Sequence, residues 1–404
     1  MMMSVYFAIT AVLSLTVDPW RINNSCLSIK ALDSSREISG TVRVGKAALA
    51  NRGDWETIIL GSSRLEMGLN PSHPAFGGKR TVNLAMSAAT ITEAIAVGNY
   101  SLDRNPHVTT VILGFEAGEF YNDVDSRIYS GFYESPFGDN NHSIERNINQ
   151  VIGGRSLVNS IATINRYLAG TGSERSPLGQ SLKPNHPANL RQYVETSAKF
   201  RSDTTDDAWA LRPQKPRLQK QELVLRFIRR VRDSGIQLYI VVSPQHALKQ
   251  IHPFLDEPIT MYWQHDLADL VNICKEANSV ATSGPPVKLW SFLTFNEYTT
   301  KPMPATDAKS QQMPGWFDLG HAQQQLGDKI IETIMSGEPV MDQNGNPYGI
   351  NLLDNDLDEI RSKWISAHLA YCKSHPGDVL WWRSIFAHAP GRSQQPDAME
   401  ETHK

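Results

Sequence analysis

Two short blocks of the chain contain the residue types of a nucleophile, a base and an orienting acid. They are Gly61-Ser62-Ser63-Arg64 and Asp318-Leu319-Gly320-His321. A serine hydroxyl becomes a nucleophile when a neighbouring base removes its proton, and histidine suits that role because its pKa lies near neutrality. A carboxylate then fixes the tautomer of the imidazole. We therefore interpret Ser63 as the nucleophile, His321 as the general base and Asp318 as the acid that orients His321.

The position of each block supports this interpretation. The apolar run 55–60 precedes the first block and predicts a buried strand. A serine at the carboxyl end of such a strand lies where open α/β sheets bind ligands. Asp318 and His321 are three residues apart, which places both side chains on one face of a turn or of the first turn of a helix. Alone, Gly-Ser-Ser is common in loops, and Asp-x-x-His is common as a helix cap followed by a surface histidine. Together, at the same edge of the predicted sheet, the two blocks indicate a catalytic site.

The remaining pattern predicts the scaffold. Strands are expected at 56–60, 81–84, 108–114, 236–242 and 287–292. Helices are expected at 88–102, 157–168, 218–232, 262–277 and 322–335. Strands that alternate with helices predict an α/β fold with a parallel, doubly wound sheet. Both blocks then lie at the carboxyl edge of that sheet.

The domain organisation follows from the same pattern. We expect an α/β domain over 53–338 that is interrupted by an insertion or lid at 116–216, because no strand pattern recurs there. A connector precedes the domain at 18–52. A mostly helical extension follows at 339–388, with an amphipathic helix over 357–371. The polar end 389–404 has the composition of a disordered tail.

The segment 1–17 is apolar and carries no charge. Its length is at the lower limit of a membrane span, so we predict a single-pass anchor, with a buried N-terminal helix as the alternative. It lacks the basic start and the small-residue cleavage site of a cleavable signal peptide. Arg21 alone favours a cytoplasmic main domain, and one arginine leaves the orientation open.

Composition excludes several classes of function. The net charge is −3 and the chain has no run of Lys or Arg, which argues against a nucleic-acid partner. Cys26, Cys274 and Cys372 lie far apart without metal-ligand spacing. We interpret the acidic loop around 116–125 as a solvated face. The sequence therefore predicts neither a metal nor a cofactor.

At this level of detail the chain resembles the SGNH/GDSL hydrolase superfamily, over residues 55–115 and 220–335. The Gly-Asp-Ser block of that family matches Gly61-Ser62-Ser63, with Ser62 in place of the aspartate. The Asp-x-x-His block matches Asp318 and His321. The resemblance implies a flavodoxin-like sheet and an ester hydrolase or acyltransferase that uses a Ser-His-Asp triad.

The two middle blocks of the family are altered. Ala88 occupies the position of the second-block glycine, and Glu116 occupies the position of the third-block asparagine. That asparagine donates to the oxyanion, whereas an ionised glutamate only accepts hydrogen bonds. The candidate donors that remain are the backbone N–H groups of Ser63 and Ala88 and the side-chain amide of Asn83.

Two other polar residues lie near the predicted edge. Arg64 either binds an anionic group on a sugar or forms a structural ion pair. His246, after the fourth strand, either lines the same cleft or caps a loop.

A narrower resemblance rests on Asp18-Pro19-Trp20, the Gly-Ser-Ser-Arg block and Ser243-Pro244-Gln245-His246. It is to membrane-anchored bacterial cell-envelope proteins, such as polysaccharide O-acetyltransferases of alginate export and proteins that D-alanylate teichoic acid. It implies an anchor in the cytoplasmic membrane, a periplasmic or extracellular main domain, an acyl donor or acylated glycan as substrate, and an envelope membrane-protein partner.

We therefore expect a serine esterase or O-acyltransferase. The alternative is a catalytically inactive carbohydrate-binding or scaffolding subunit of an envelope assembly, which the altered blocks at Ala88 and Glu116 motivate.

Overall fold

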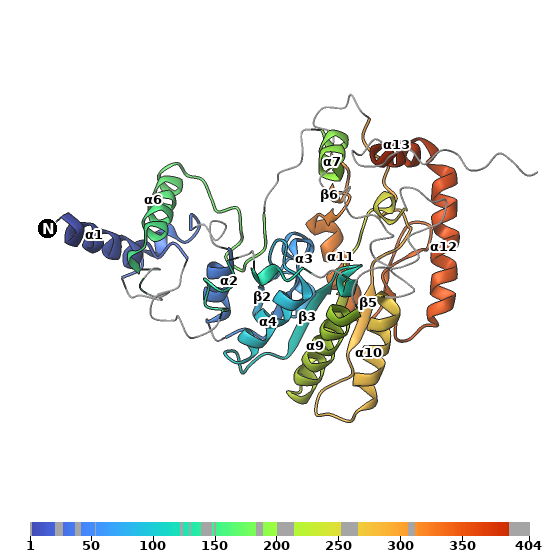
Figure 1. Ribbon diagram of the computed structural model, residues 1–404, viewed down its shortest axis with the longest axis horizontal. Coiled ribbons are helices and arrows are strands. Elements are labelled where there is room, and N and C mark those ends of the chain that lie inside the picture. The colour runs from blue at the N-terminus through green and yellow to red at the C-terminus, as the bar shows by residue number, and fades with distance from the viewer. Residues whose placement is uncertain are drawn as a thin grey trace, which may run out of the picture.

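A mainly parallel sheet of six strands forms the centre of the computed structural model (Figure 1). The strands are β1 (Thr57–Leu60), β2 (Thr81–Asn83), β3 (Thr110–Phe115), β4 (Gln237–Val242), β5 (Lys288–Ser291) and β10 (Ile350–Asn351). Their order is β10-β5-β4-β3-β1-β2, and only β10 runs antiparallel. The α/β class and the five predicted strands are thus confirmed.

The structure describes residues 2–20, 27–36, 42–52, 54–121, 124–128, 131–138, 148, 151–182, 189–199, 214–251, 266–305 and 312–387. The expected tail at 389–404 lies outside these residues, as do parts of the expected insertion at 116–216.

The strands are buried on both faces because alternate side chains enter two separate cores. Ile58 and Leu60 of β1 belong to one core, and Ile59 belongs to the other. Helices α2 (Val42–Ala50), α4 (Ile91–Leu102), α9 (Gln214–Asp233) and α10 (Ala268–Ser279) contribute to the first core. Helix α11 (Gln324–Ser336) covers the other face, together with the short α3 (Ser63–Gly68). This is why the strand sequences are almost continuously apolar.

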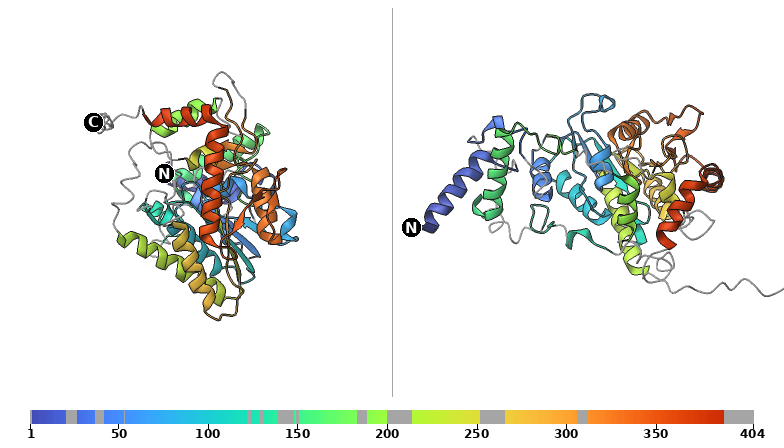
Figure 2. Two further views of the ribbon diagram at one scale, coloured as in Figure 1. Left: turned by 90° about the vertical axis from the view of Figure 1, so that its right-hand side faces the viewer. Right: turned by 90° about the horizontal axis from the view of Figure 1, so that it is seen from above.

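Three further helices lie around this body. They are α7 (Leu190–Lys199), α12 (Leu357–Ser374) and α13 (Pro376–Ala387). The long α12 runs along one side of the molecule, and α7 lies beside α13 at one end of it (Figures 1 and 2). Ile360 and Trp364 of α12 enter the first core, so the C-terminal region is part of the same body.

In the extension that we expected to be mostly helical, the first residues are not helical. There the chain forms β8 (Val340–Met341), β9 (Pro347–Tyr348) and then β10. The cause is a turn at Asp342: its Oδ1 accepts from the N–H groups of Asn344 and Asn346, at 2.9 and 2.7 Å. Gly345 in that turn has a φ of 77°, which glycine adopts without strain.

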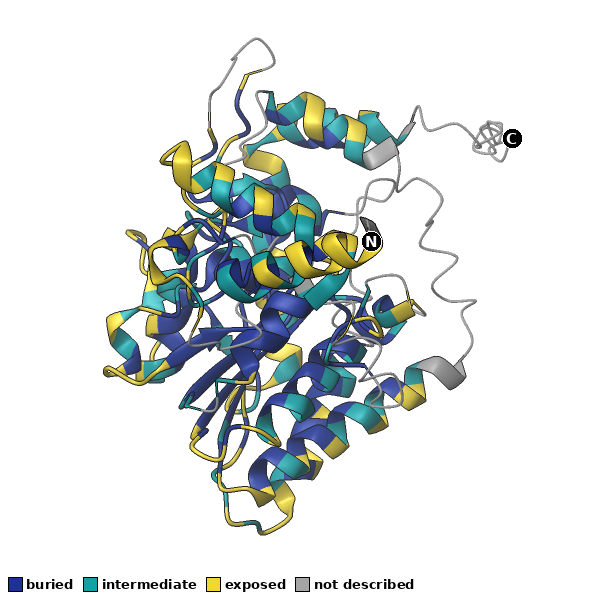
Figure 3. Cartoon of the chain, turned by 90° about the vertical axis from the view of Figure 1, so that its left-hand side faces the viewer, coloured by how far each residue is buried: buried dark blue, intermediate teal, exposed yellow. Residues whose placement is uncertain are grey.

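Helix α1 (Met2–Val17) lies beside α6 (Gly154–Leu168), at the end of the molecule away from the sheet (Figures 1 and 2). The contact is lined by small polar side chains: Thr10 and Ser14 of α1 are buried, and Ser14 Oγ lies 2.5 Å from Ser156 Oγ. The opposite face of α1 is exposed and appears yellow in Figure 3.

The predicted single-pass anchor is wrong, and so is the membrane localisation that depended on it. Within the residues that the structure describes, no helix combines the length and the apolarity needed to cross a bilayer. Helix α1 has 16 residues and spans about 24 Å at 1.5 Å per residue, short of the ~30 Å hydrocarbon core.

Helices α3 and α11 contact each other through glycine backbones. A Cβ added at Gly327 of α11 would lie 1.8 Å from the carbonyl oxygen of Gly68, the last residue of α3. Only glycine permits this approach, because the obstructing atoms are backbone atoms that no side-chain rotation can move. The contact joins the helix that begins at Ser63 to the helix that follows His321.

We therefore expect Gly327→Ala to destabilise the protein by about 1–3 kcal/mol in urea unfolding, although alanine is the better helix former. Gly377→Ala is the matched control, because that position in α13 is exposed and a Cβ there meets nothing within 4 Å. An unfolding free energy for Gly327→Ala equal to that of the control would contradict the contact.

Candidate functional site

The structure brings Ser63, His321 and Asp318 together at the carboxyl edge of the sheet. Ser63 Oγ lies 2.8 Å from His321 Nε2. His321 Nδ1 lies 2.8 Å from Asp318 Oδ2 and 3.0 Å from its Oδ1. Because the carboxylate only accepts, Nδ1 carries the hydrogen and Nε2 accepts from the serine hydroxyl. Side-chain exposures of 25% for His321 and 16% for Asp318 leave the group accessible from solvent.

The sheet register places Ser63 at this edge. Strand β1 ends at Leu60, and Gly61 turns the chain with a φ of 146°, which side-chain-bearing residues rarely adopt. Ser62 is the N-cap of α3: its Oγ accepts from the Arg64 N–H at 3.2 Å. Ser63 is thus the first residue of the helix, where the backbone N–H has no partner within the helix.

Asp318 and His321 lie on a short hairpin instead of a helix. The hairpin consists of β6 (Trp316–Asp318) and β7 (His321–Ala322), and α11 begins only at Gln324. Of the two expected arrangements, a turn or the first turn of a helix, the structure shows the turn. Asp318 Oδ1 accepts from the N–H groups of Gly320 at 2.6 Å and His321 at 2.9 Å, and this local bonding favours a turn over a helix.

The same bonds hold Asp318 ionised. Burial acts to raise the pKa of this carboxyl, but the hydrogen bond and charge of His321 outweigh it, with the Gly320 N–H and Lys249 adding to the effect. The net pKa of Asp318 lies well below its usual range. An ionised Asp318 beside the imidazole stabilises the imidazolium that forms when His321 accepts a proton.

Ala88 follows a strand end that is hydrogen-bonded to the turn at Gly61. The Met86 N–H donates to the Gly61 carbonyl at 2.9 Å, and Ser63 and Ala88 each follow this bond by two residues. Ala88 has a φ of 60° and is exposed. A left-handed alanine is strained by roughly 1 kcal/mol or more, and glycine would adopt this conformation freely.

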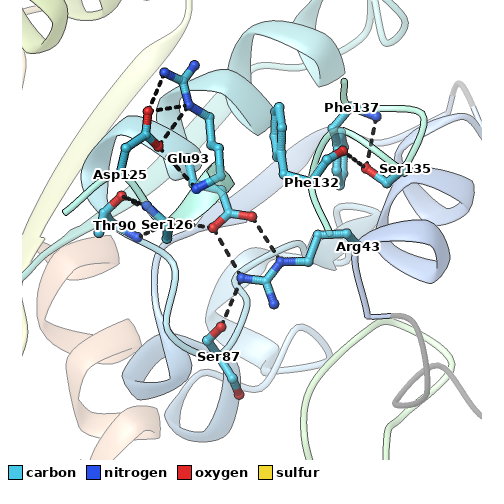
Figure 4. Close-up of polar contacts among 10 residues, drawn as sticks. Arg43, Ser87, Thr90, Glu93, Asp125, Ser126, Phe132, Ser135 and Phe137 are labelled. Carbon is cyan, nitrogen blue, oxygen red and sulfur yellow. Dashed lines mark hydrogen bonds and ion pairs between the residues drawn. The ribbon is translucent and has the colours of Figure 1, made fainter. Parts of the chain in front are cut away.

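The loop that carries Ala88 is fixed by buried carboxylates that the sequence analysis did not identify. Ser87 Oγ donates to Glu66 Oε2 at 2.9 Å. The Ser87 carbonyl accepts from Arg43, which also forms two hydrogen bonds to Glu93 (Figure 4). Glu93 stands alone in an apolar helical segment, and an isolated acid in such a segment is the signal that could have revealed it. Glu66 lies in the mixed segment Ser-Arg-Leu-Glu-Met-Gly and gives no such signal.

Glu66 belongs to a buried ionic cluster with two cations. Arg175 Nε donates to its Oε1 at 2.9 Å, and Lys46 Nζ lies 3.6 Å from the same oxygen. Burial acts to raise the pKa of Glu66, but Lys46 and Arg175 outweigh it and the pKa lies below its usual value. Burial lowers the pKa of Lys46 to about 8, against the attraction of Glu66. The cluster links α2, α3 and the segment at 173–182 to the Ala88 loop.

Asn83 supports α3 instead of facing the site. Its two amide hydrogens are donated to the carbonyls of Leu65 at 2.9 Å and Leu69 at 3.0 Å, and its Oδ1 accepts from the Ala85 N–H. The side chain is fully buried. The amide therefore has no hydrogen left for a substrate oxygen.

His246 is a buried histidine that caps a loop. Its Nε2 lies 2.7 Å from the Lys301 carbonyl, and its Nδ1 accepts from the Leu248 N–H. Burial lowers its pKa to about 4, so it is neutral at pH 7. The backbone N–H of His246 donates to the Leu319 carbonyl at 3.0 Å, and so the loop steadies the Asp318–His321 hairpin without lining the cleft.

Arg64 and Glu116 form an ion pair on the edge beside Ser63. Glu116 Oε1 also accepts from Ser62 Oγ at 2.5 Å and from Ser243 Oγ at 3.2 Å. The two charged side chains are 15% and 19% exposed. Of the two interpretations of Arg64, the structure shows the ion pair, and it places no amide donor at position 116.

The acidic loop is not the solvated face that the sequence predicted. Glu119 is 5% exposed; its Oε1 accepts from the Ile91 N–H at 2.8 Å and lies 3.4 Å from Lys220 Nζ. Burial raises the pKa of Glu119 to about 7 against the attraction of Lys220. Asp125 pairs with Arg127, and position 123 lies outside the described residues.

A cavity of about 580 Å³ lies elsewhere, between β5, β10 and α12. Aromatic side chains such as Trp290, Phe295 and Trp364 line it, and no residue of the Ser63 site does. The Ser63 site therefore lies outside this cavity.

Comparisons of the chain with protein-family models, with curated proteins and with solved structures found no match.

The buried Glu119 predicts a pH dependence of stability. Its pKa is near 4.5 when unfolded and about 7 when folded, so the folded state binds more protons between these values. Stability should therefore fall as pH rises from about 4.5 to 7. Glu119→Gln should reduce this fall by on the order of 2 kcal/mol in urea unfolding at pH 5 and pH 7.5. A variant with the same fall as the wild type would show that Glu119 titrates normally.

Proposed function

We propose that this protein is a serine ester hydrolase or O-acyltransferase of the SGNH/GDSL type. The observation that carries the proposal is the chain of two hydrogen bonds from Ser63 through His321 to Asp318. Nucleophile, base and orienting acid within hydrogen-bond reach are the arrangement that activates a serine. The two blocks are more than 250 residues apart in the sequence, so their meeting is a property of the fold.

The strand order supports the SGNH assignment. The five parallel strands run in the order β2-β1-β3-β4-β5, which is the order of flavodoxin-like sheets. In this order the connections change direction between β1 and β3, and ligands bind at that point, beyond the carboxyl ends of the strands. Ser63 follows β1 and Glu116 follows β3, so the proposed site occupies the switch point.

The residues support a two-step acyl transfer. Ser63 Oγ attacks the ester carbonyl carbon while its proton passes to His321 Nε2. The bond from the carbonyl carbon to the alcohol oxygen then breaks, and His321 returns the proton to the leaving alcohol. Water, or a hydroxyl of an acceptor, attacks the acyl-serine in the second step, again with His321 as base, and free Ser63 is regenerated.

The developing oxyanion is stabilised by the backbone N–H groups of Ser63 and Ala88. Each of these residues comes two positions after one end of the hydrogen bond between the Met86 N–H and the Gly61 carbonyl. The left-handed backbone of Ala88 supports this role, because it is the conformation that suits the glycine of the family's second block. With two donors in place of three, the proposed rate enhancement is lower by about 10²–10³-fold.

The substrate class follows from the resemblance of the Gly-Ser-Ser-Arg and Ser-Pro-x-His blocks to polysaccharide-modifying proteins. We propose an acylated glycan or a related ester, with water or a sugar hydroxyl as acceptor.

A second candidate function is a binding or scaffolding subunit without turnover. The specific observation in its favour is Glu116, which is an acceptor engaged with its neighbours where the family has an oxyanion donor. It predicts glycan binding that is unchanged in Ser63→Ala and no ester turnover in the wild type.

The test is ester turnover by Ser63→Ala with p-nitrophenyl acetate. We expect a loss on the order of 10⁴-fold, because the serine makes the covalent bond. Ser72→Ala, on an exposed turn, is the matched control and should retain full activity. Wild-type turnover in purified Ser63→Ala would exclude this serine as the nucleophile.

A further inference from the structure

Glu116 contacts the residues on both sides of Ser63. Its Oε1 accepts from Ser62 Oγ at 2.5 Å, and its carboxylate pairs with the Arg64 guanidinium. We propose that Glu116 is a positioning residue that clamps the nucleophile turn and so aims Ser63 Oγ at His321. This inference rests on the proposed function and assigns a role to the position where the chain departs most from the family pattern.

The nucleophile turn needs such a support. Helix α3 has six residues, and an isolated helix of this length is not stable in water. Ser63 is its first residue, at the end where backbone hydrogen bonding is incomplete. Side-chain contacts to Ser62 and Arg64 therefore fix the direction in which Ser63 points. Catalytic geometry tolerates errors of only about 0.5 Å, so the support has a kinetic consequence.

Glu116 itself is held by the sheet. It directly follows β3, and the Ser243 N–H after β4 donates to the Phe115 carbonyl at 3.0 Å. Ser243 Oγ, fully buried, donates to Glu116 Oε1 at 3.2 Å. The ends of β3 and β4 thus fix the position of Glu116. Glu116 in turn fixes the turn that follows β1.

The chemistry of the carboxylate separates this role from substrate binding. An ionised carboxylate accepts hydrogen bonds and cannot donate to an oxyanion. Its acceptors are already engaged by Ser62, Ser243 and Arg64. Gly61 and Gly114 allow the close packing beneath: a Cβ on Gly61 would lie 3.3 Å from Gly114 Cα, and one on Gly114 would lie 2.7 Å from Leu65.

The test compares Glu116→Ala and Glu116→Gln with the wild type. Glutamine keeps an acceptor for Ser62 and Ser243 but loses the ion pair with Arg64, whereas alanine loses both. The matched control is Glu276→Gln, which removes an exposed ion pair (2.7 Å) between Glu276 on α10 and Arg229 on α9. Two readouts are needed: kcat and KM with p-nitrophenyl acetate, and the ¹⁵N NMR signals of the His321 ring, assigned with His321→Ala.

We expect Glu116→Ala to lower kcat about 10²-fold with KM within about threefold of wild type, because a misplaced nucleophile reacts slowly but binds substrate normally. Glu116→Gln should fall between Glu116→Ala and the wild type. The His321 ring signals of Glu116→Ala should shift toward those of Ser63→Ala, since the hydrogen bond from Ser63 weakens. Glu276→Gln should change neither readout.

Unchanged kcat and unchanged His321 signals in Glu116→Ala would overturn the clamp, even if the variant melts at a lower temperature. Shifted His321 signals in a protein whose wild type shows no turnover would support the clamp and refute the proposed function. If Glu116→Ala does not fold, the same two readouts on Glu116→Gln decide the question.

Discussion

The hydrogen bond between Ser63 and His321 is the contact on which the proposed site depends. It joins two segments whose sequence separation is 258 residues, so no local propensity can form it. Parallel pairing brings the carboxyl ends of β1, β3 and β4 to one edge. The backbone contact of Gly68 with Gly327 then fixes α3 against α11. The strand register determines where Ser63 lies along the edge of the sheet. The contact between Gly68 and Gly327 determines how closely α3 approaches α11.

Buried or half-buried carboxylates hold each part of the site in place. Glu66 and Glu93 hold the loop at Ser87, Glu119 binds the first N–H of α4, and Glu116 holds the turn at Ser63. A buried charge is costly unless it is paired and hydrogen-bonded, and each of these acids has a cation within ion-pair distance. These ion pairs and hydrogen bonds are directional, so they fix the positions of the loops around Ser63, which apolar packing alone does not.

The sequence allowed the sheet and the three candidate catalytic residues to be predicted, because both leave local signals. Apolar runs such as 236–242 mark strands covered on both faces, and the Ser block and the Asp-x-x-His block become candidates as a pair, because both lie at the carboxyl edge of the predicted sheet. The roles of Glu116 and Asn83 were not predictable, since each depends on tertiary contacts, such as that of Glu116 with Ser62, 54 residues away. The membrane anchor was predicted wrongly for the same reason, because the apolar sequence of α1 does not reveal that Ser14 packs on α6. For His246 the loop cap was one of two expectations, and the structure shows it.

The central claim is that the fold activates Ser63, and labelling with a fluorophosphonate probe tests it most directly. The probe reacts with activated serines without requiring knowledge of the natural substrate. The account predicts a single adduct, mapped by mass spectrometry to Ser63 among all the serines of the chain, that is absent in His321→Ala. A folded wild-type protein that remains unlabelled, or that is labelled equally in His321→Ala, would contradict it.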